Sequence, residues 1–184
     1  MNEKMKSALK NTLESDERIL WESGVTPYRL FDGKEGRGTL ILWVVMIALA
    51  ACAVAFKIKG GESGIGFYVI VAVILAAVIL SPILACRQIN GQRYYITDRR
   101  VLSVRPDGTV SAMDRRNIDA VRLYKVDCGG AALAMGSGLL EEMDKQLRWR
   151  ANHPMVDGNF NVQGLVFYRA KGAEEAMRIL SAAM

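Results

Sequence analysis

Two long runs without charge constrain this chain more than any other feature. No Asp, Glu, Lys or Arg lies between Arg37 and Lys57, and none lies between Glu62 and Arg87. A helix needs about 20 apolar residues to cross the ~30 Å hydrocarbon layer of a membrane. Neither run shows the polar stripe of a surface helix. The pattern therefore predicts a hairpin of two transmembrane helices, at about residues 39–56 and 66–85.

A pair of buried helices in a soluble core is the alternative interpretation. Such helices usually stop at about ten to fifteen residues and carry some polar positions. The two runs have few polar or weakly polar side chains: Thr39, Cys52, Ser63, Tyr68 and Ser81. The membrane interpretation is therefore favoured. The spans also lack the charges that usually mark ion pathways, which argues against a transporter or channel core.

The hairpin divides the rest of the chain into two unequal pieces. The predicted organisation is an N-terminal cytoplasmic segment over residues 1–38, the hairpin over 39–86, and a compact cytoplasmic domain over 87–184. The last piece is long enough to bury one small core, and the first is too short to fold alone.

The N-terminal segment carries two periodic patterns. The spacing of Met5, Leu9 and Leu13 predicts an amphipathic helix over Asn2–Glu14. The stretch Glu17–Glu22 alternates like a strand, which would place Ile19 and Trp21 on one face.

After Arg87 the hydrophobic period changes to two, and turn signals become frequent. This pattern predicts strands over Arg93–Thr97, Val101–Arg105, Thr109–Met113, Ala120–Val126, Leu139–Glu142, Leu147–Ala151 and Val162–Arg169. An acidic first turn and an apolar stripe predict a closing helix over Ala173–Ala183. The fold class is thus a membrane-anchored α+β protein, with antiparallel strands closed by one helix.

The charge balance favours a location at the inner face of a membrane. The net charge is +5, which suits anionic lipid at about 1 kcal/mol per nearby basic residue and is too small to indicate nucleic acid. Basic residues flank the outer ends of both runs, whereas the loop offers only Lys57 and Lys59. The positive-inside rule then predicts an integral inner-membrane protein with both termini cytoplasmic.

One stretch resembles a known family. The residues RYYITDRRVLSV contain the series Tyr95-Ile96-Thr97-Asp98-Arg99-Arg100-Val101, followed by a turn at Pro106–Gly108. This pattern, behind a hydrophobic hairpin and a leading ERILWESGVTP, resembles the bacterial pleckstrin-homology-like membrane proteins. The resemblance implies a pleckstrin-homology-like (PH-like) β-barrel or sandwich of two bent antiparallel sheets, capped by the C-terminal helix. It also implies a domain that binds a partner.

Residues with catalytic or metal-binding potential are isolated in the sequence. His153 is the only histidine, and Cys128 has no partners at a metal-ligand spacing. The acidic group Glu141, Glu142 and Asp144 is typical of an exposed turn. We therefore expect no catalytic residue, no cofactor and no metal.

Four arginines after the second run are candidate contacts for a lipid headgroup or a partner: Arg99, Arg100, Arg115 and Arg116. The alternative is a solvated strand face whose arginines pair with nearby acids, namely Asp98, Asp114 and Asp119. On that alternative Arg100 is structural and satisfies turn carbonyls.

The predicted function is a non-enzymatic interaction module. It would contact membrane lipids through residues 39–86 and bind a protein partner, or a second copy of itself, through an exposed strand edge. Two other functions stay open at this point. One is a sensor of anionic lipid headgroups, and the other is an accessory subunit of a membrane transporter or enzyme.

Overall fold

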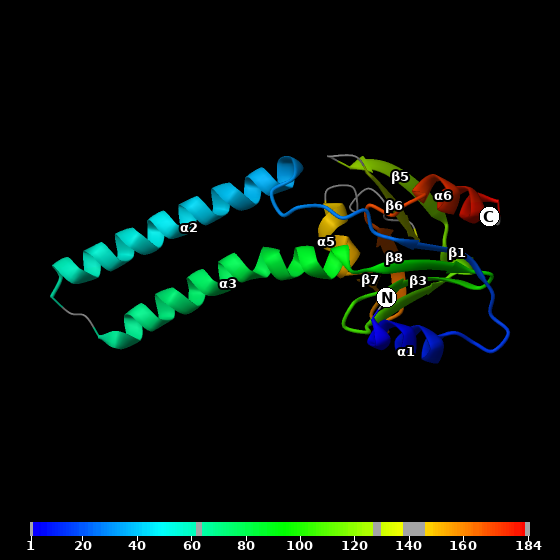
Figure 1. Cartoon of the computed structure of the whole chain (residues 1–184), viewed down its shortest axis with the longest axis horizontal. Helices are drawn as coiled ribbons and strands as arrows, with labels where there is room; N and C mark the ends of the chain where they lie inside the picture. Colours follow the sequence, from blue (N-terminus) through cyan, green and yellow to red (C-terminus); the bar gives the residue numbers. More distant parts are fainter. Residues whose placement is uncertain (1, 62–63, 127–129, 138–145, 183–184) are drawn as a thin grey trace. The chain divides into compact units, whose positions relative to one another are not determined.

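The computed structural model of the chain describes residues 2–61, 64–126, 130–137 and 146–182 (Figure 1). The chain forms two compact units, one made of Met1–Pro27 with Gln88–Met184 and the other of Tyr28–Arg87. The predicted strand at Leu139–Glu142 lies outside the described residues.

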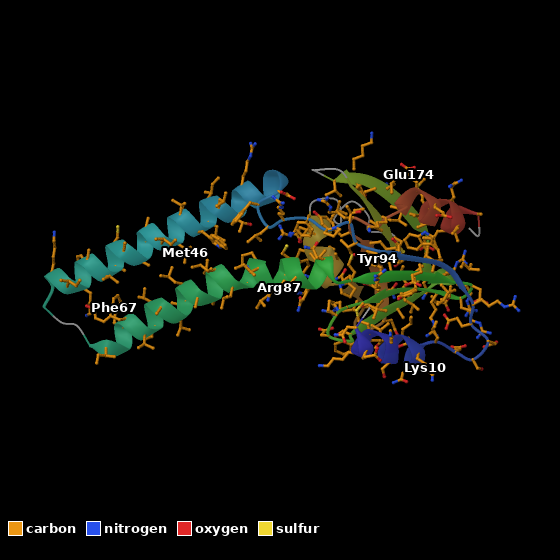
Figure 2. The ribbon with its side chains drawn as sticks, in the orientation of Figure 1. Lys10, Met46, Phe67, Arg87, Tyr94 and Glu174 are labelled. Atoms are coloured by element: carbon orange, nitrogen blue, oxygen red, sulfur yellow. The ribbon has the colours of Figure 1, made fainter. Side chains whose placement is uncertain are left out.

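Two long helices make up most of the second unit. They are α2 (Gly33–Lys59) and α3 (Ile65–Asn90), and both are long and apolar enough to cross a membrane. Their side chains project outward along both helices (Figure 2), and Phe56 and Ile65 are 82% and 80% exposed. The prediction of two long apolar helices is confirmed, and both helices extend beyond the predicted charge-free spans.

The hairpin segment is inserted between two strands that pair with each other. Strand β1 (Ile19–Gly24) precedes it, strand β2 (Arg93–Thr97) follows it, and the two are antiparallel neighbours. Gly24 at the end of β1 is the register partner of Arg93 at the start of β2. The N-terminal segment thus supplies an edge strand to the sheet of the C-terminal part.

The first sheet has the order β1-β2-β3-β4, where β3 spans Arg100–Val104 and β4 spans Val110–Asp114. Helix α1 (Glu3–Thr12) covers one face of this sheet, as its amphipathic spacing predicts. A buried cluster joins the helix to the strands, made of Met5, Leu9, Tyr95, Leu102 and Val104. Because this face is covered, β2 and β3 are buried on both sides.

Strand β1 corrects one detail of the sequence prediction. Ile19 and Trp21 do not share a buried face, since Ile19 is 43% exposed and Trp21 is 7% exposed. The register with β2 shifts between these two residues. A β-bulge of this kind places one extra residue on the strand and reverses the alternation.

The second sheet has the order β5-β6-β8-β7. Its strands are Ala120–Val126, Gly130–Gly136, Val162–Phe167 and Met155–Val156 for β5, β6, β8 and β7. Helix α6 (Ala173–Ser181) packs on β5 and β6 through Ala173, Ala176 and Leu180. In Figure 1, α1 and α6 lie on opposite sides of the two sheets.

The described strands do not close into the barrel that the resemblance implied. Strands β4 and β5 follow each other in the chain but belong to different sheets. A short 3-10 helix, η1 (Arg115–Asn117), lies between them. The described strands form two antiparallel sheets, with α1 on the first and α6 on the second.

The stretch Leu147–Ala151 was predicted as a strand and is a helix instead. It forms α5 (Leu147–Asn152), in which only Ala151 and Asn152 are buried. The alternation of Leu147, Trp149 and Ala151 has a period of two, but such a short run fits a helical turn equally well. Leu, Arg and Ala are also good helix formers.

A buried aromatic stack joins the two sheets. The ring of Phe167 on β8 stacks on Tyr94 of β2 at 4.5 Å and on Trp21 of β1 at 6.1 Å. The Tyr94 hydroxyl donates to Gln92 Oε1 at 2.8 Å and accepts from the Tyr168 N–H at 3.1 Å. Gln92 Nε2 in turn donates to Asn152 Oδ1 at 2.8 Å. This polar network ties the start of β2 to α5 and to the end of β8.

We expect Tyr94→Phe to lower the free energy of unfolding of the two-sheet domain by about 1–2 kcal/mol, because it leaves buried polar atoms of Gln92 and Tyr168 without this partner. Denaturant titration of the full chain in neutral detergent, followed by near-UV circular dichroism, measures this change.

The neighbouring Tyr95→Phe is the matched control. The Tyr95 hydroxyl makes a longer contact, 3.3 Å to Glu22 Oε1, at a less buried position, so the expected loss is about 0.5 kcal/mol. Equal losses in the two variants would show that the hydrogen-bond network of Tyr94 contributes no more to the free energy of unfolding than the single contact of Tyr95 with Glu22.

Candidate functional site

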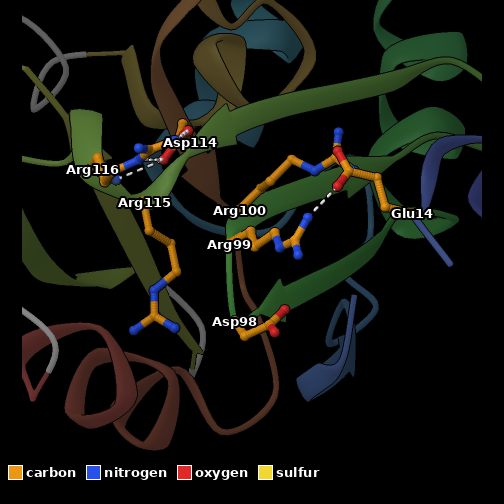
Figure 3. Close-up of a pocket in the computed structure, with 7 residues that line it drawn as sticks. All are labelled: Glu14, Asp98, Arg99, Arg100, Asp114, Arg115 and Arg116. Atoms are coloured by element: carbon orange, nitrogen blue, oxygen red, sulfur yellow. Dashed lines mark hydrogen bonds and ion pairs between the residues drawn. The ribbon is translucent and has the colours of Figure 1, made fainter. Parts of the chain in front are cut away.

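The four candidate arginines surround one hollow of about 540 Å³, and we call them the arginine cluster. Figure 3 shows them with the three acidic residues that complete the lining: Glu14, Asp98 and Asp114. Arg99 lies in the turn between β2 and β3, Arg100 is the first residue of β3, and Arg115 and Arg116 come from η1 directly after β4. Antiparallel pairing of β3 with β4 brings these two turns to the same end of the sheet, with Arg100 opposite Asp114.

The first two arginines are held by an acidic run of the N-terminal segment: Glu14, Asp16 and Glu17. Arg99 forms ion pairs with Glu14 and with Asp16 at an exposed position. Arg100 Nε donates to Glu17 Oε1 at 3.1 Å, and Arg100 Nη2 donates to the Thr12 carbonyl at 2.9 Å. Both arginines therefore fasten the link between α1 and β1 to the β2–β3 turn.

Glu17 is the most perturbed acid of this group. Its side chain is 0% exposed, and it also accepts a hydrogen bond from Thr97 Oγ1 at 2.7 Å. Hydrogen bonding from Arg100, with further help from Thr97, lowers the pKa of Glu17 to about 2 against the opposing effect of burial. Arg100 and Glu17 thus form a hydrogen-bonded ion pair at the edge of the core.

The Thr97-Asp98 dipeptide organises the turn itself. Thr97 Oγ1 accepts from the N–H groups of Arg99 and Arg100, at 3.2 and 2.8 Å. Asp98 Oδ1 accepts from the Arg18 N–H at 3.1 Å, and the Asp98 N–H donates to the Arg18 carbonyl at 3.1 Å. The residues that carry the family resemblance therefore have structural contacts in this chain.

The other two arginines also have internal contacts. Arg115 points toward α6 (Figure 3) and donates to the carbonyls of Thr97 and Ile179, at 3.0 and 3.2 Å. Arg116 pairs with Asp114 at 3.0 Å but is itself 90% exposed. Hydrogen bonds from Arg116 lower the pKa of Asp114.

The acids around the arginine cluster outnumber the arginines by one. Four arginines lie among five acids, since Asp16 and Glu17 join the three that line the hollow. A phosphate group entering here would compete with carboxylates that already accept from three of the guanidinium groups.

Of the acidic partners expected from the sequence, Asp114 pairs with Arg116, whereas Asp98 contacts the Arg18 backbone. Glu14, Asp16 and Glu17 were not predicted as partners of the arginines. The available signal was the acidic run itself, which directly precedes β1.

In the part of the chain that the structure describes, no three His, Cys, Asp or Glu side chains are placed to hold a metal ion. The His153 ring stacks on Trp149 at 4.6 Å. Cys128, Glu141, Glu142 and Asp144 lie outside the described residues.

No protein-family model, no curated protein and no solved structure matches this chain. Its resemblance to the PH-like membrane proteins stays a prediction based on the Tyr95–Val101 motif and its position behind the hairpin.

We expect Glu17→Gln to destabilise the two-sheet domain by roughly 2 kcal/mol at neutral pH, because it leaves the partly buried Arg100 without its charge partner. The pKa of Glu17 falls from its ordinary 4.5 to about 2 on folding. Its stabilising effect is therefore complete above pH 4.5 and is lost as the pH falls from 4.5 toward 2. Unfolding titrations of the wild type at intervals over this range should show the loss.

The Glu17→Gln variant should show a flatter dependence over the same pH range. Glu14→Gln is the matched control, because Glu14 is an exposed partner of Arg99 and its removal should cost less than about 1 kcal/mol. An unchanged pH slope in Glu17→Gln would contradict the assignment of the shift to this residue.

Proposed function

We propose that this chain is a membrane-anchored binding module. In this proposal α2 and α3 cross the inner membrane as a hairpin, and the two-sheet domain lies on the cytoplasmic side with both termini. The observation that supports it is a pair of long helices whose central runs, residues 38–56 and 65–86, carry no charged side chain, and whose most apolar stretches are not buried. A soluble protein rarely exposes so much contiguous apolar surface.

The insertion point favours an even number of membrane crossings. Because β1 and β2 are paired neighbours, the hairpin segment leaves the sheet beside the point where it returns. Basic residues near the outer ends of the helices, Arg29, Arg37 and Arg87, outnumber the loop residues Lys57 and Lys59. This bias supports the cytoplasmic side for the domain.

Strand β5 is the edge best suited to bind a protein partner. It ends the second sheet, pairs only with β6 among the described residues, and is seven residues long. The other edges are less available. Strand β7 has two residues, β4 contacts β8 of the other sheet, and the end of β1 is covered by the bridge between Val25 and Ala170. An extended segment of the partner would add a strand to β5.

Two exposed charges on β5 agree with this function. Arg122 and Lys125 are exposed on an otherwise half-buried strand. Charged side chains on an edge strand prevent non-specific pairing, so a partner strand with acidic residues would be preferred. A PH-like domain that binds proteins in this way would fit the family resemblance.

The two other candidate functions have weaker support. A headgroup sensor at the arginine cluster would need its ion pairs with Glu14, Asp16 and Glu17 to open. An accessory subunit of a larger complex would be identified by its survival in mild detergent, and no contact of the described residues favours it specifically.

We expect the full chain to stay in the membrane pellet after alkaline carbonate washing. In a cysteine-free background, a Gly60→Cys variant in the loop should react with a membrane-impermeant maleimide in intact cells. The matched Lys10→Cys variant should react only after the cells are permeabilised. Recovery of the chain in the aqueous fraction would contradict the anchor, and the reverse labelling pattern would contradict the orientation.

We expect a photo-crosslinking amino acid at Arg122 or Lys125 to trap a partner in living cells, because both side chains lie beside the open edge of β5. The same amino acid at Lys10 of α1 is the control. An adduct of twice the 20.3 kDa chain mass would identify self-association. Equal adducts from β5 and α1, or none from β5, would contradict the edge as the binding surface.

A further inference from the structure

A second hollow, of about 470 Å³, lies where the hairpin segment is joined to the two-sheet domain. We call it the insertion-site pocket. Gly24, Val25 and Pro27 line it where the chain leaves the first sheet, and residues 90–93 line it where the chain returns. The remaining walls come from the start of α1, from Pro106 and from Lys171.

The charged side chains that line this pocket are both basic. They are Arg93 and Lys171, and no Asp or Glu is among the lining residues. Within the described residues neither side chain forms an ion pair. This is the opposite of the arginine cluster, where the acidic run, Asp114 and three backbone carbonyls hold the guanidinium groups.

Gly24 positions both basic residues. It is the register partner of Arg93, and its carbonyl accepts from the Lys171 N–H at 3.1 Å. A Cβ atom placed on Gly24 would lie 3.1 Å from Arg93 Nη1 and 3.4 Å from Arg93 Cζ. The guanidinium of Arg93 therefore rests against the bare backbone of Gly24, and the backbone of Lys171 is hydrogen-bonded to the same residue.

The rest of the lining is neutral and fixed. The Gln92 amide is committed to Ala151, Asn152 and Tyr94, and the Pro106 carbonyl accepts from Asn2 Nδ2 at 3.4 Å. Met5, Val25 and Pro27 add apolar wall. The planar guanidinium of Arg93 and the compact ammonium of Lys171, with no carboxylate among the lining residues, suit an anion with several oxygens.

We propose that the insertion-site pocket binds a phosphate group. This site is separate from the arginine cluster. If the hairpin spans the bilayer as proposed above, the pocket lies within a few residues of the membrane surface, and the phosphate of an anionic lipid headgroup is its natural ligand. The assignment of the phosphate to a lipid depends on the proposed function. The phosphate site itself does not, because it is inferred from the charges and geometry of the pocket.

The test uses the full chain, purified in neutral detergent and titrated with dioctanoyl phosphatidylglycerol under native mass spectrometry. Dioctanoyl phosphatidylcholine tests the need for net negative charge, and glycerol 3-phosphate tests a soluble source. Arg93→Gln and Lys171→Gln should each weaken binding of the anionic lipid roughly five- to tenfold. The double variant Lys10→Gln/Arg178→Gln removes two exposed charges away from the pocket and should bind like the wild type.

Arg93→Lys retains the charge without the fork and should weaken binding less than Arg93→Gln, which keeps the test valid if the glutamine variant folds poorly. If glycerol 3-phosphate binds as tightly as the anionic lipid, and Arg93→Gln and Lys171→Gln weaken this binding, the site is supported and its ligand is a soluble phosphate. Binding that is absent, or that falls equally in the control variant, would overturn the site. If the chain stays in membranes but binds no phosphate, the proposed phosphate site is wrong and the proposed membrane anchor is unaffected. If the chain is soluble and binds phosphate, the proposed anchor is wrong and the phosphate site is unaffected.

Discussion

The pairing of β1 with β2 is the constraint on which the rest of this structure depends. These strands are neighbours in the sheet, yet the whole hairpin segment lies between them in the chain. The cost of closing such a long loop grows only slowly with its length, and the buried side chain of Trp21 helps to offset it by stacking on Phe167. The pairing fixes where the chain leaves and re-enters the domain. It therefore also brings together the two chain segments that line the insertion-site pocket.

The ion pairs of Arg99 and Arg100 support the same pairing from the other end of β1. Glu17, two residues before the strand, is buried against Arg100 and Thr97, while Asp98 exchanges two hydrogen bonds with the Arg18 backbone. In a partly buried position such a hydrogen-bonded pair fixes register, and its net stabilisation is smaller than its Coulomb attraction. The Thr-Asp-x-Arg series can thus be understood as a connection between an N-terminal strand and the sheet that it completes, without assigning it a ligand.

Much of the fold could be predicted because local patterns determine it. The charge-free runs gave the two long helices, and the four-residue spacing of Met5 and Leu9 gave α1. The turn after β3 was expected from Gly108, whose φ of 91° is rare for residues with a side chain.

The errors arose where tertiary contacts determine the local structure. A bulge reversed the alternation of β1, α5 replaced a short alternating stretch, and the sheets separated at η1. The partners of Arg99 and Arg100 lie more than eighty residues away in the sequence, so local charge alternation pointed instead to Asp98, Asp114 and Asp119.

The two basic sites show why counting arginines in a sequence does not locate an anion site. Arg99 and Arg100 form the denser cluster, but the fold brings three acids to them, and ion pairs within the domain neutralise their charge. Arg93 and Lys171 are far apart in the sequence and unremarkable there, but the fold places both beside the uncharged backbone of Gly24. Electrostatic attraction for a ligand depends on the charge left after internal pairing. By that criterion the site with fewer basic residues has the greater capacity to attract a phosphate.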